Sequence, residues 1–329
     1  MDLQRRCLGI GSVMIVVAVI LRLLSAGAWQ TIATALEAEQ TAAFLLYLET
    51  GRVVHPQPET VPTETKPTTL PTTVPTEPTE APAAVPCFTA SDAELVQVRY
   101  HASYRPDLYQ MVTSTLQWDL CIEAPTVLIL SSHATESYDP TAEGYTPSGA
   151  YRTLDTDRNM ISIGAYVAAR LEEAGIRVIH DTTLHDYPSY NDSYIESRKT
   201  AQAYLEQYPS IRLVLDLHRD ATDENAAQLD TSAQVDGVEA AQLMLVVGTR
   251  QDGWQSNMAL AVKLTALLEK RDPGITRPIS FRTQRFNQDL SAGALLVEVG
   301  AAGNTRQEAL IAAGALADAI IELSKGANY

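Results

Sequence analysis

Residues 125–329 are predicted to form an α/β domain with a mostly parallel sheet and helices on both faces. Short apolar runs rich in branched side chains, typical of strands buried on both faces, alternate with segments of helical length. Parallel strands need crossover connections, and these place helices over the sheet. Three of the apolar runs end abruptly in charged or polar residues, at the sheet edge where open α/β sheets keep their sites.

The same pattern predicts each element of the domain. The first helix is expected to end at Gly175, because glycine readily takes the left-handed conformation that closes a helix. In chain order we expect a strand at 126–131, a helix at 159–174, a strand at 176–179, a helix at 194–208, a central strand at 211–221, a strand at 242–247, a helix at 254–270, a short strand near Ile279, a strand at 294–299 and a helix at 306–324.

An apolar run near the amino terminus predicts a membrane segment. Two arginines precede residues 7–24, which are apolar except for Ser12 and Arg22 and are about long enough to span a bilayer. We therefore expect residues 1–28 to be a cytoplasmic tip and an uncleaved transmembrane helix, with the rest of the chain outside the cytoplasm. The alternative is a cleavable signal peptide, because residues 26–28 resemble a cleavage site.

The composition changes twice between this segment and the α/β domain. Residues 29–55 are helix-prone and predict a juxtamembrane helical stalk. Residues 56–90 are mainly Pro, Thr and Glu, so they predict a disordered linker that holds the domain away from the membrane; a partner-binding motif is the alternative. Residues 91–124 predict a short helix and a segment wrapped onto the domain, which is expected to fold without them.

Charge and cysteine content narrow the class of protein. The chain has 40 acidic and 24 basic residues, a formal net charge of −16, which argues against nucleic-acid binding because that requires a basic surface. Cys7 lies in the apolar run, so Cys87 and Cys121 are the possible disulfide pair. Their spacing leaves open whether they are bonded.

Four chemically reactive residues lie at the ends of three predicted strands. His133 and Glu136 follow the first strand, His218 ends the central strand, and Glu298 interrupts the apolar strand near the carboxyl terminus. Zinc hydrolases use His and carboxylate ligands, an open position for water and a separate carboxylate for proton transfer. The first three residues are therefore candidate zinc ligands, and Glu298 is a candidate general base. A histidine taken singly is more often a hydrogen-bonded loop residue, but the coincidence of all four favours a metal site.

Two charged residues of this group have alternative interpretations. Arg219, next to a candidate ligand, could steady an oxyanion or bind a substrate carboxylate, or it could form a salt bridge to Asp220 or Asp186. Glu298 could be ion-paired with Arg219 or Arg285. Both alternatives are structural roles that the sequence leaves open.

The histidines of the segment 180–188 are weaker candidates for the site. His180 and His185 are expected to line the cleft or to tie its loops together.

Several short motifs of the domain form a specific combination. They are His133-Ala-Thr-Glu-Ser-Tyr138, Asn159-Met160, His180-Asp-Thr-Thr-Leu-His-Asp-Tyr-Pro188, Ser197-Arg198, Asp216-Leu-His-Arg-Asp-Ala221, Asn287-Gln-Asp-Leu290, Leu296-Val-Glu-Val-Gly300 and Asn304-Thr305. Together they resemble the stage II sporulation protein P family over about residues 125–325. The predicted anchor and spacer also fit this family.

The resemblance implies an amidase-like three-layer domain with the activity of a zinc-dependent N-acetylmuramoyl-L-alanine amidase of endospore-forming bacteria. Such an enzyme cleaves the amide bond between N-acetylmuramic acid and L-alanine of the peptidoglycan stem peptide, in septal wall thinning and engulfment. The resemblance also implies two partners, a stage II sporulation protein D-like transglycosylase and a protein M-like membrane tether. The implied location is the mother-cell septal or engulfing membrane, with a single span and an extracytoplasmic catalytic domain.

Site residues can be carried over from the family by position. His133 and His218 match its zinc histidines, and Glu298 matches its catalytic glutamate. The sequence departs from the family at residues 131–133, which read Ser-Ser-His in place of His-Thr-His, and at Phe286, which replaces a tyrosine. The first change affects a contact behind the ligand and not the ligand itself.

The third zinc ligand has more than one candidate. Glu136 matches the glutamate of the family's His-x-x-Glu motif, and we expect it to be the ligand. Related amidases take this carboxylate from the start of the next helix, where Asp155 and Asp157 lie.

Two other functions fit the same residues. A zinc carboxypeptidase or endopeptidase acting on the stem peptides would use a similar ligand set. A wall-binding scaffold could keep the fold after losing activity. The bond that is cleaved separates the first from an amidase, and a zinc assay tests the second.

Overall fold

The computed structural model describes residues 88–116, 119–140, 151–221 and 231–325. The predicted membrane helix, the stalk and residues 56–87 of the linker lie outside the described residues, and so does Cys87. Within the described ranges no helix is both long and apolar enough to cross a membrane. The anchor and the disulfide therefore stay predictions.

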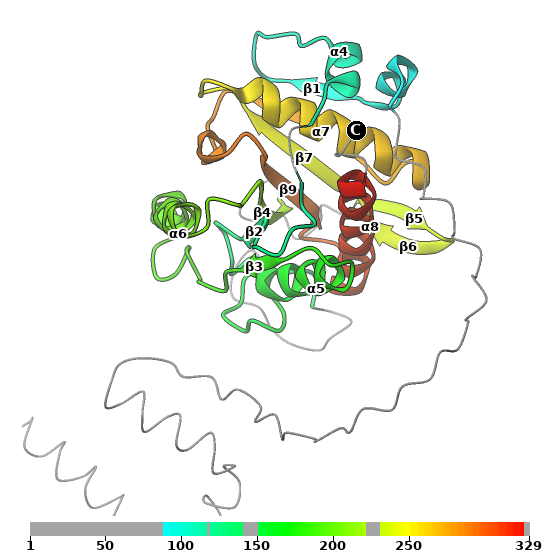
Figure 1. The fold of residues 1–329 in the computed structure, drawn as a ribbon. Helices are drawn as coiled ribbons and strands as arrows, with labels where there is room; N and C mark the ends of the chain where they lie inside the picture. Colours follow the sequence, from blue (N-terminus) through cyan, green and yellow to red (C-terminus); the bar gives the residue numbers. More distant parts are fainter. Residues whose placement is uncertain (1–87, 117–118, 141–150, 222–230, 326–329) are drawn as a thin grey trace, which may run out of the picture. The chain divides into compact units, whose positions relative to one another are not determined.

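Seven strands form one sheet in the order β1-β8-β7-β9-β4-β2-β3 (Figure 1). Every neighbouring pair is parallel except β7 with β9, which confirms the mostly parallel sheet. A strand that runs parallel to the one before it needs a crossover helix between them. The described residues between β4 and β7 contain only a hairpin, and β7 runs in the opposite direction. The strands are β1 (Val98–Tyr100), β2 (Val127–Leu130), β3 (Val178–His180), β4 (Leu213–Asp220), β7 (Leu243–Gly248), β8 (Ile279–Arg282) and β9 (Ala294–Ala301), and the hairpin is β5 (Ser232–Val235) with β6 (Val238–Ala241).

The predicted helices are present with nearly the expected bounds. Asn159 begins the first of them, where its side chain accepts a hydrogen bond from the Ile161 amide at 2.9 Å. Gly175 follows the same helix with a φ of +84°, the left-handed value that favours glycine. The helices are α4 (Leu108–Thr113), α5 (Met160–Glu173), α6 (Ser193–Gln207), α7 (Trp254–Arg271) and α8 (Arg306–Lys325), with 3-10 turns η1 (Ala90–Leu95), η2 (Tyr190–Asp192) and η3 (Gln288–Leu290).

Helices cover both faces of the sheet, but unevenly. On one face, strand residues such as Leu217 and Val297 pack with α5, α7 and α8 into the main hydrophobic core. On the other face α6 covers β2 and β4 with a smaller cluster, and it lies apart from α8 in the fold (Figure 1). A third cluster on β7 and β9 is contacted by two partly buried hydrophobic residues of the described chain, Tyr194 and Phe286. This second face is therefore only partly closed by helix.

The pairing of β4 with β9 contains an irregularity beside the candidate site. His218 lies opposite Glu298, but Asp220 lies opposite Ala301, so β9 has one extra residue. Gly300 occupies this stretch with a φ of +73°. A Cβ atom there would meet the Cβ of Ala241 at 2.7 Å, so the position needs glycine for both its conformation and its space.

The described part of residues 91–124 belongs to the domain, whereas the sequence predicts only a short helix and a segment wrapped onto its surface. β1 pairs in parallel with β8 and extends the sheet, and α4 packs on α7. Val96, Val112 and Leu120 are buried in the main core. The described residues belong to one compact unit that spans Glu80–Tyr329. The strand β1 escapes sequence analysis because it is only three residues long and contains an exposed arginine.

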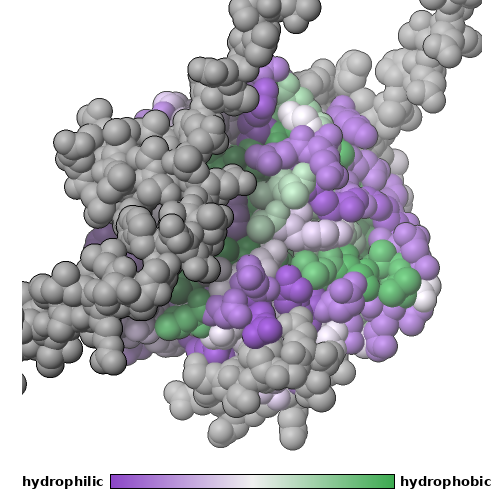
Figure 2. Space-filling view, turned by 90° about the horizontal axis from the view of Figure 1, so that it is seen from below, coloured by the Kyte–Doolittle hydropathy of each residue, from purple (hydrophilic) through white to green (hydrophobic). Residues whose placement is uncertain are grey.

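The face of the domain seen in Figure 2 carries many polar residues where it is not drawn in grey. Figure 2 shows hydrophilic residues over much of one face, with hydrophobic residues in separate groups between them. Exposed apolar side chains in small groups are normal for a folded domain.

Candidate metal centre

Three candidate ligands meet at the carboxyl ends of β2 and β4. The turn after β2 carries His133 and Glu136, and it is closed by a hydrogen bond from the Glu136 amide to the His133 carbonyl at 3.1 Å. His133 Nδ1 lies 3.3 Å from Glu136 Oε1, and His218 Nδ1 lies 3.6 Å from Glu136 Oε2. One potential ligand atom from each residue lies within 4.8 Å of the other two. The structure thus brings the three sequence-predicted ligands together.

Asp216 supports His218 from behind. The two residues are two apart on β4 and therefore share a face. Asp216 Oδ1 lies 2.9 Å from His218 Nε2, and the carboxylate also accepts hydrogen bonds from the Ser132 amide and hydroxyl at 2.7 and 2.6 Å. A carboxylate behind a histidine fixes the orientation of the ring and leaves its other nitrogen for a metal. No role for Asp216 is predicted from the sequence, although its spacing from His218 on one strand indicates that the two side chains share a face.

The charges of the cluster reinforce one another. Burial alone would lower the pKa of His218, but the carboxylates of Asp216 and Glu136 raise it well above its ordinary value. Burial would raise the pKa of Glu136, and Arg219 with the two histidines holds it well below the ordinary value instead. Glu136 is therefore ionised, as a metal ligand must be.

Glu298 differs from the other carboxylates of the site. It lies opposite His218 on β9 and is half-buried beside the cavity, and its Oε2 atom is buried without a hydrogen-bond partner among the described residues. Burial raises its pKa to about 8, with further contributions from neighbouring charges. The alternative partners are engaged elsewhere, since Arg219 lies 3.7 Å from Glu136 and Arg285 lies 3.7 Å from Asp289. A carboxylate oxygen that is buried without a partner is costly and is typical of a functional position.

Arg219 contacts the loop that follows Glu136. Its side chain is 1% exposed and donates hydrogen bonds to the carbonyls of Ser137 and Tyr151 at 2.9 and 3.1 Å. Its backbone amide contacts Glu136 Oε2 at 3.3 Å. These contacts favour a role in positioning Glu136, and the catalytic role of Arg219 stays a prediction.

The two carboxylates that the sequence suggests as salt-bridge partners of Arg219 pair with other arginines. Asp220 pairs with Arg277 at 2.7 Å, and Asp186 pairs with Arg152 at 3.2 Å. Arg152 also lies 3.7 Å from Glu136. It was not predicted from the sequence, where nothing distinguishes it from other loop arginines.

The alternative third ligands lie away from the cluster. Asp155 and Asp157 are exposed, and Asp155 pairs with Arg158 at 3.3 Å. Neither belongs to the group of residues whose donor atoms converge. The geometry therefore favours Glu136.

The two weaker histidine candidates have structural surroundings. His185 is buried, with Nδ1 2.9 Å from the Ser131 carbonyl and Nε2 3.1 Å from the Thr200 hydroxyl, so it ties the turn after β2 to α6. His180 lies against α5, close enough that a Cβ atom at Gly164 would meet its Nε2 at 2.5 Å.

Aromatic residues form a wall of the site. The ring of His133 lies 4.5 Å from that of Tyr190 and 5.4 Å from that of Tyr194, and Tyr194 is stacked on His218 at 6.2 Å. Burial raises the pKa of Tyr194 well above its ordinary value, so its hydroxyl stays protonated. The cavity beside this wall has a volume of about 880 Å³ and also contacts Glu298 and Arg282. The tyrosines precede or begin α6, and no sequence signal marked them.

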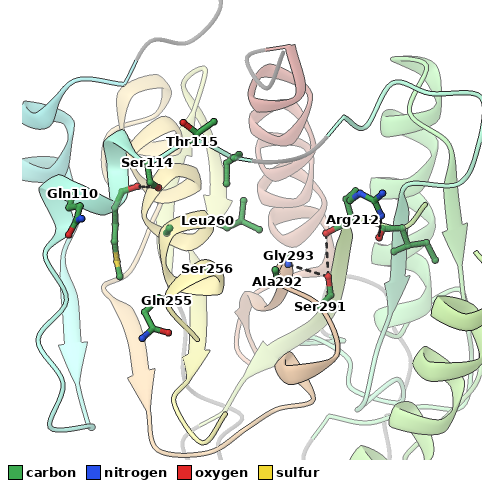
Figure 3. Close-up of a pocket in the computed structure, with 14 residues that line it drawn as sticks. Gln110, Ser114, Thr115, Arg212, Gln255, Ser256, Leu260, Ser291, Ala292 and Gly293 are labelled. Atoms are coloured by element: carbon green, nitrogen blue, oxygen red, sulfur yellow. Dashed lines mark hydrogen bonds between the residues drawn. The ribbon is translucent and has the colours of Figure 1, made fainter. Parts of the chain in front are cut away.

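A second cavity lies at the opposite ends of β4 and β9. It has a volume of about 640 Å³ and is lined by residues of α4 and α7 together with Arg212 and Gly293 (Figure 3). Among the described residues that line it there is no histidine, cysteine or carboxylate. It therefore offers no metal ligands of the kind that converge at the first cavity.

The fold and the site define an α/β protein with a candidate metal centre of two histidines and a glutamate at the carboxyl ends of its strands. Residues 66–321 match the model of the Stage II sporulation protein P (SpoIIP) family. The chain belongs to this family of sporulation proteins.

Proteins similar to the chain include one from Bacillus subtilis and one from Clostridium difficile 630. Stage II sporulation protein P of Bacillus subtilis (strain 168) is 30% identical over 208 residues, which is 60% of this chain and 50% of that protein. The chain thus spans about half the length of this relative. The crystal structure of N-acetylmuramoyl-L-alanine amidase from Clostridium difficile 630 is similar with a TM-score of 0.34 at 16% identity, over 61% of this chain and 94% of that chain.

Proposed function

We propose that the protein is a zinc-dependent N-acetylmuramoyl-L-alanine amidase that cleaves the amide bond between N-acetylmuramic acid and the stem peptide of peptidoglycan. The observation that carries hydrolysis is Glu298, whose buried Oε2 atom has no hydrogen-bond partner among the described residues and which lies opposite His218 beside a convergent set of ligands. Family membership supports the choice of substrate.

The residues of the cluster fit zinc. Imidazole nitrogen and carboxylate oxygen are its usual ligands in hydrolases, and three protein ligands leave a position open. His133, Glu136 and His218 would hold the ion, and Asp216 supplies the carboxylate behind a ligating histidine. When bound, zinc would activate a water molecule and polarise the scissile carbonyl.

Glu298 acts as the general base and then as the general acid of the reaction. It takes a proton from the attacking water as the new carbon–oxygen bond forms, and it returns a proton to the amine as the carbon–nitrogen bond breaks. Its pKa of about 8 lies near neutrality, where a carboxylate is a much better base than an ordinary glutamate. A cation held at the neighbouring cluster would lower this pKa and keep the base ionised.

The surrounding residues hold the reacting groups in place. Arg219 and Arg152 both contact Glu136, and Arg219 fixes the loop that follows it. Tyr190 and Tyr194 lie against the rings of the histidines on one side of the cluster.

We further propose that the enzyme is anchored by residues 1–28, with its domain outside the cytoplasm, and acts in septal wall thinning during engulfment. Family membership and the apolar amino-terminal sequence support this setting. The proposed partners are a stage II sporulation protein D-like transglycosylase and a protein M-like membrane tether. Co-purification from sporulating cells tests both partners, and membrane fractionation tests the anchor.

The decisive experiment combines metal analysis with product masses. The full chain is incubated with purified peptidoglycan, and we expect one zinc per molecule and release of intact stem peptides. Cleavage within the peptide would instead identify a peptidase. Bound zinc without any cleavage would identify a wall-binding scaffold.

A further inference from the structure

The cavity of the metal centre continues across one face of the sheet. Its lining includes His218 on β4, Glu298 on β9, Met244 on β7 and Arg282 on β8, which are neighbouring strands in this order. The part from Glu298 to Arg282 is called the cross-sheet groove below. From Glu298 to Arg282 the cavity crosses two strand spacings, about 10 Å at roughly 4.8 Å each. Glu298 lies opposite Met244 and Arg282 lies opposite Gly248, so Arg282 is also four residues, about 13 Å, further along the strands. The resulting diagonal of about 16 Å is the length of an extended peptide of about five residues.

The floor of the cross-sheet groove is apolar. Met244, Val246 and Leu296 line it and form a separate hydrophobic cluster. Among the described hydrophobic residues, Tyr194 and Phe286 pack against this cluster, and both also line the cavity. The floor can therefore contact the neutral parts of a bound chain, while charged groups are confined to the two ends.

Arg282 is held at the far end of the groove. Its Nε atom donates a hydrogen bond to the buried Ser280 hydroxyl at 2.9 Å. Its carbonyl accepts hydrogen bonds from the amide and the hydroxyl of Thr249 at 2.9 and 3.0 Å. The backbone of Arg282 and its Nε atom are thus held in place, and its two terminal nitrogens remain available for a further contact.

Arg282 has no carboxylate partner among the described residues, unlike the other arginines near the cavity. Arg152 pairs with Asp186, Arg219 with Glu136 and Arg277 with Asp220. The difference is notable because the chain has 40 acidic residues to choose from. A half-buried guanidinium with free terminal nitrogens is well suited to bind a carboxylate in a bidentate contact.

We propose that Arg282 binds a carboxylate of the substrate peptide about five residues from the bond that is cleaved at Glu298. This assignment rests on the proposed hydrolase function and adds a specificity for peptides that carry a free carboxylate at that distance. The apolar groove floor supports the intervening residues, and Arg282 sets the register of the peptide.

The test uses two matched peptides attached to N-acetylmuramic acid. One has a free carboxylate at the fourth or fifth residue, and in the other this carboxylate is amidated. Cleavage is measured with the full chain, with Arg282→Gln and with Arg250→Gln. Arg250 is exposed and does not line the cavity, so the control removes the same charge from a nearby position.

Arg282→Gln is expected to raise KM at least about 10-fold for the free carboxylate and to leave kcat and zinc content unchanged. It should change little for the amidated peptide, which the unaltered protein already binds weakly. Arg250→Gln should behave as the unaltered protein. Equal losses on both peptides would show a merely structural role and overturn the assignment, as would an unchanged preference for the free carboxylate.

A binding measurement separates this assignment from the proposed reaction. Calorimetry with Glu298→Gln, and with the same variant also carrying Arg282→Gln, should show at least about 10-fold weaker binding of the free carboxylate in the second protein. If that holds but the unaltered protein cleaves nothing, the hydrolase proposal fails and the Arg282 assignment stands. If neither peptide binds to Glu298→Gln, the Arg282 assignment is overturned.

Discussion

The two faces of the sheet differ in composition and in covering. On one face, residues such as Leu217, Leu245 and Val297 are fully buried beneath α5, α7 and α8. On the other face the same strands carry His218, Glu298 and other polar residues beside an open cavity. Because neighbouring residues of a strand point to opposite faces, each strand supplies both the core and the site.

This arrangement separates stability from chemistry within single strands. The core face contributes the apolar burial that can offset the cost of enclosing charges on the other face. Substitutions on the two faces should therefore change different measured quantities. The predictions below test this separation, beginning with the largest expected effect.

Removal of residues 88–124 should damage the core face most severely. The sequence alone suggests that a fragment beginning at Pro125 folds, but the structure leads to the opposite expectation. Val96, Val112 and Leu120 are buried, each worth roughly 1.5–3 kcal/mol, and β1 would be lost from the sheet. This loss is comparable with a typical total stability of about 5–15 kcal/mol. Circular dichroism and thermal melting should show an unfolded or aggregating 125–329 fragment, whereas a well-folded one would place these residues outside the cooperative domain.

Glu298→Gln should stop the reaction without harming the fold. Loss of a general base typically reduces the rate by about 10²- to 10⁴-fold. Zinc should stay bound, and the melting temperature should be unchanged or higher because a poorly solvated charge is removed. Zinc content, melting temperature and amide cleavage are measured on one preparation. Near-normal cleavage would mean that another carboxylate is the base, and loss of zinc would make Glu298 a ligand.

His133→Ala and His218→Ala should each weaken zinc binding more strongly than a change behind the ligands. Asp216→Asn removes only the supporting carboxylate, which typically costs about 10- to 100-fold in metal affinity. Each histidine variant should exceed that loss. Asp155→Asn is the control and should bind zinc normally. An empty site in Asp155→Asn together with a filled one in Glu136→Gln would reassign the third ligand.

Met244→Ala and Leu245→Ala compare the two faces at adjacent residues. Leu245 is fully buried in the main core, so its truncation should cost about 2–5 kcal/mol in the free energy of unfolding and leave cleavage per folded molecule nearly unchanged. Met244 lines the cavity, so its truncation should cost less stability and raise KM. Urea unfolding and steady-state kinetics measure both. Similar profiles for the two variants would mean that the faces are not functionally distinct.

The pH dependence of stability should reveal Glu298 in the metal-free protein. Its pKa is raised from 4.5 to about 8 on folding, so between these values the folded state holds a proton that the unfolded state releases. Stability from this group is fully present below pH 4.5 and is lost as pH rises through 8. Relative to Glu298→Gln, the unaltered protein should therefore become less stable between pH 5 and pH 8. Urea unfolding with a chelator present measures the difference, and a constant difference across this range would show an ordinary pKa.

Much of the fold follows from local sequence, and the exceptions have physical reasons. The apolar runs of β2, β4 and β9 are long enough to be recognised, and their polar ends identify His133, Glu136, His218 and Glu298. β1 is short and has mixed polarity, so it acquires its role only by pairing with β8. The antiparallel direction of β7 depends on the connection before it.

The supporting residues of the site were harder to predict than the ligands. Tyr194, Arg152 and Arg282 reach the cavity from α6, a loop and β8, and nothing in their local sequence indicates that these segments meet. Asp216 is the exception, because its spacing from His218 on one strand already placed both on the same face. Ligand type is a local property of sequence, whereas a cavity wall depends on distant parts of the chain.

Gly300 separates two parts of β9 whose positions are fixed by different contacts. Before it, Glu298 must stay opposite His218; after it, the amide of Ala301 donates a hydrogen bond to the Asn304 side chain at 2.9 Å, and that side chain also contacts Thr231. The extra residue at this point absorbs the mismatch between the two registers. Changes in the chain after Gly300 can therefore accumulate without moving Glu298, provided that the glycine itself is kept. Gly300 thus marks the position along β9 beyond which substitutions need not disturb Glu298.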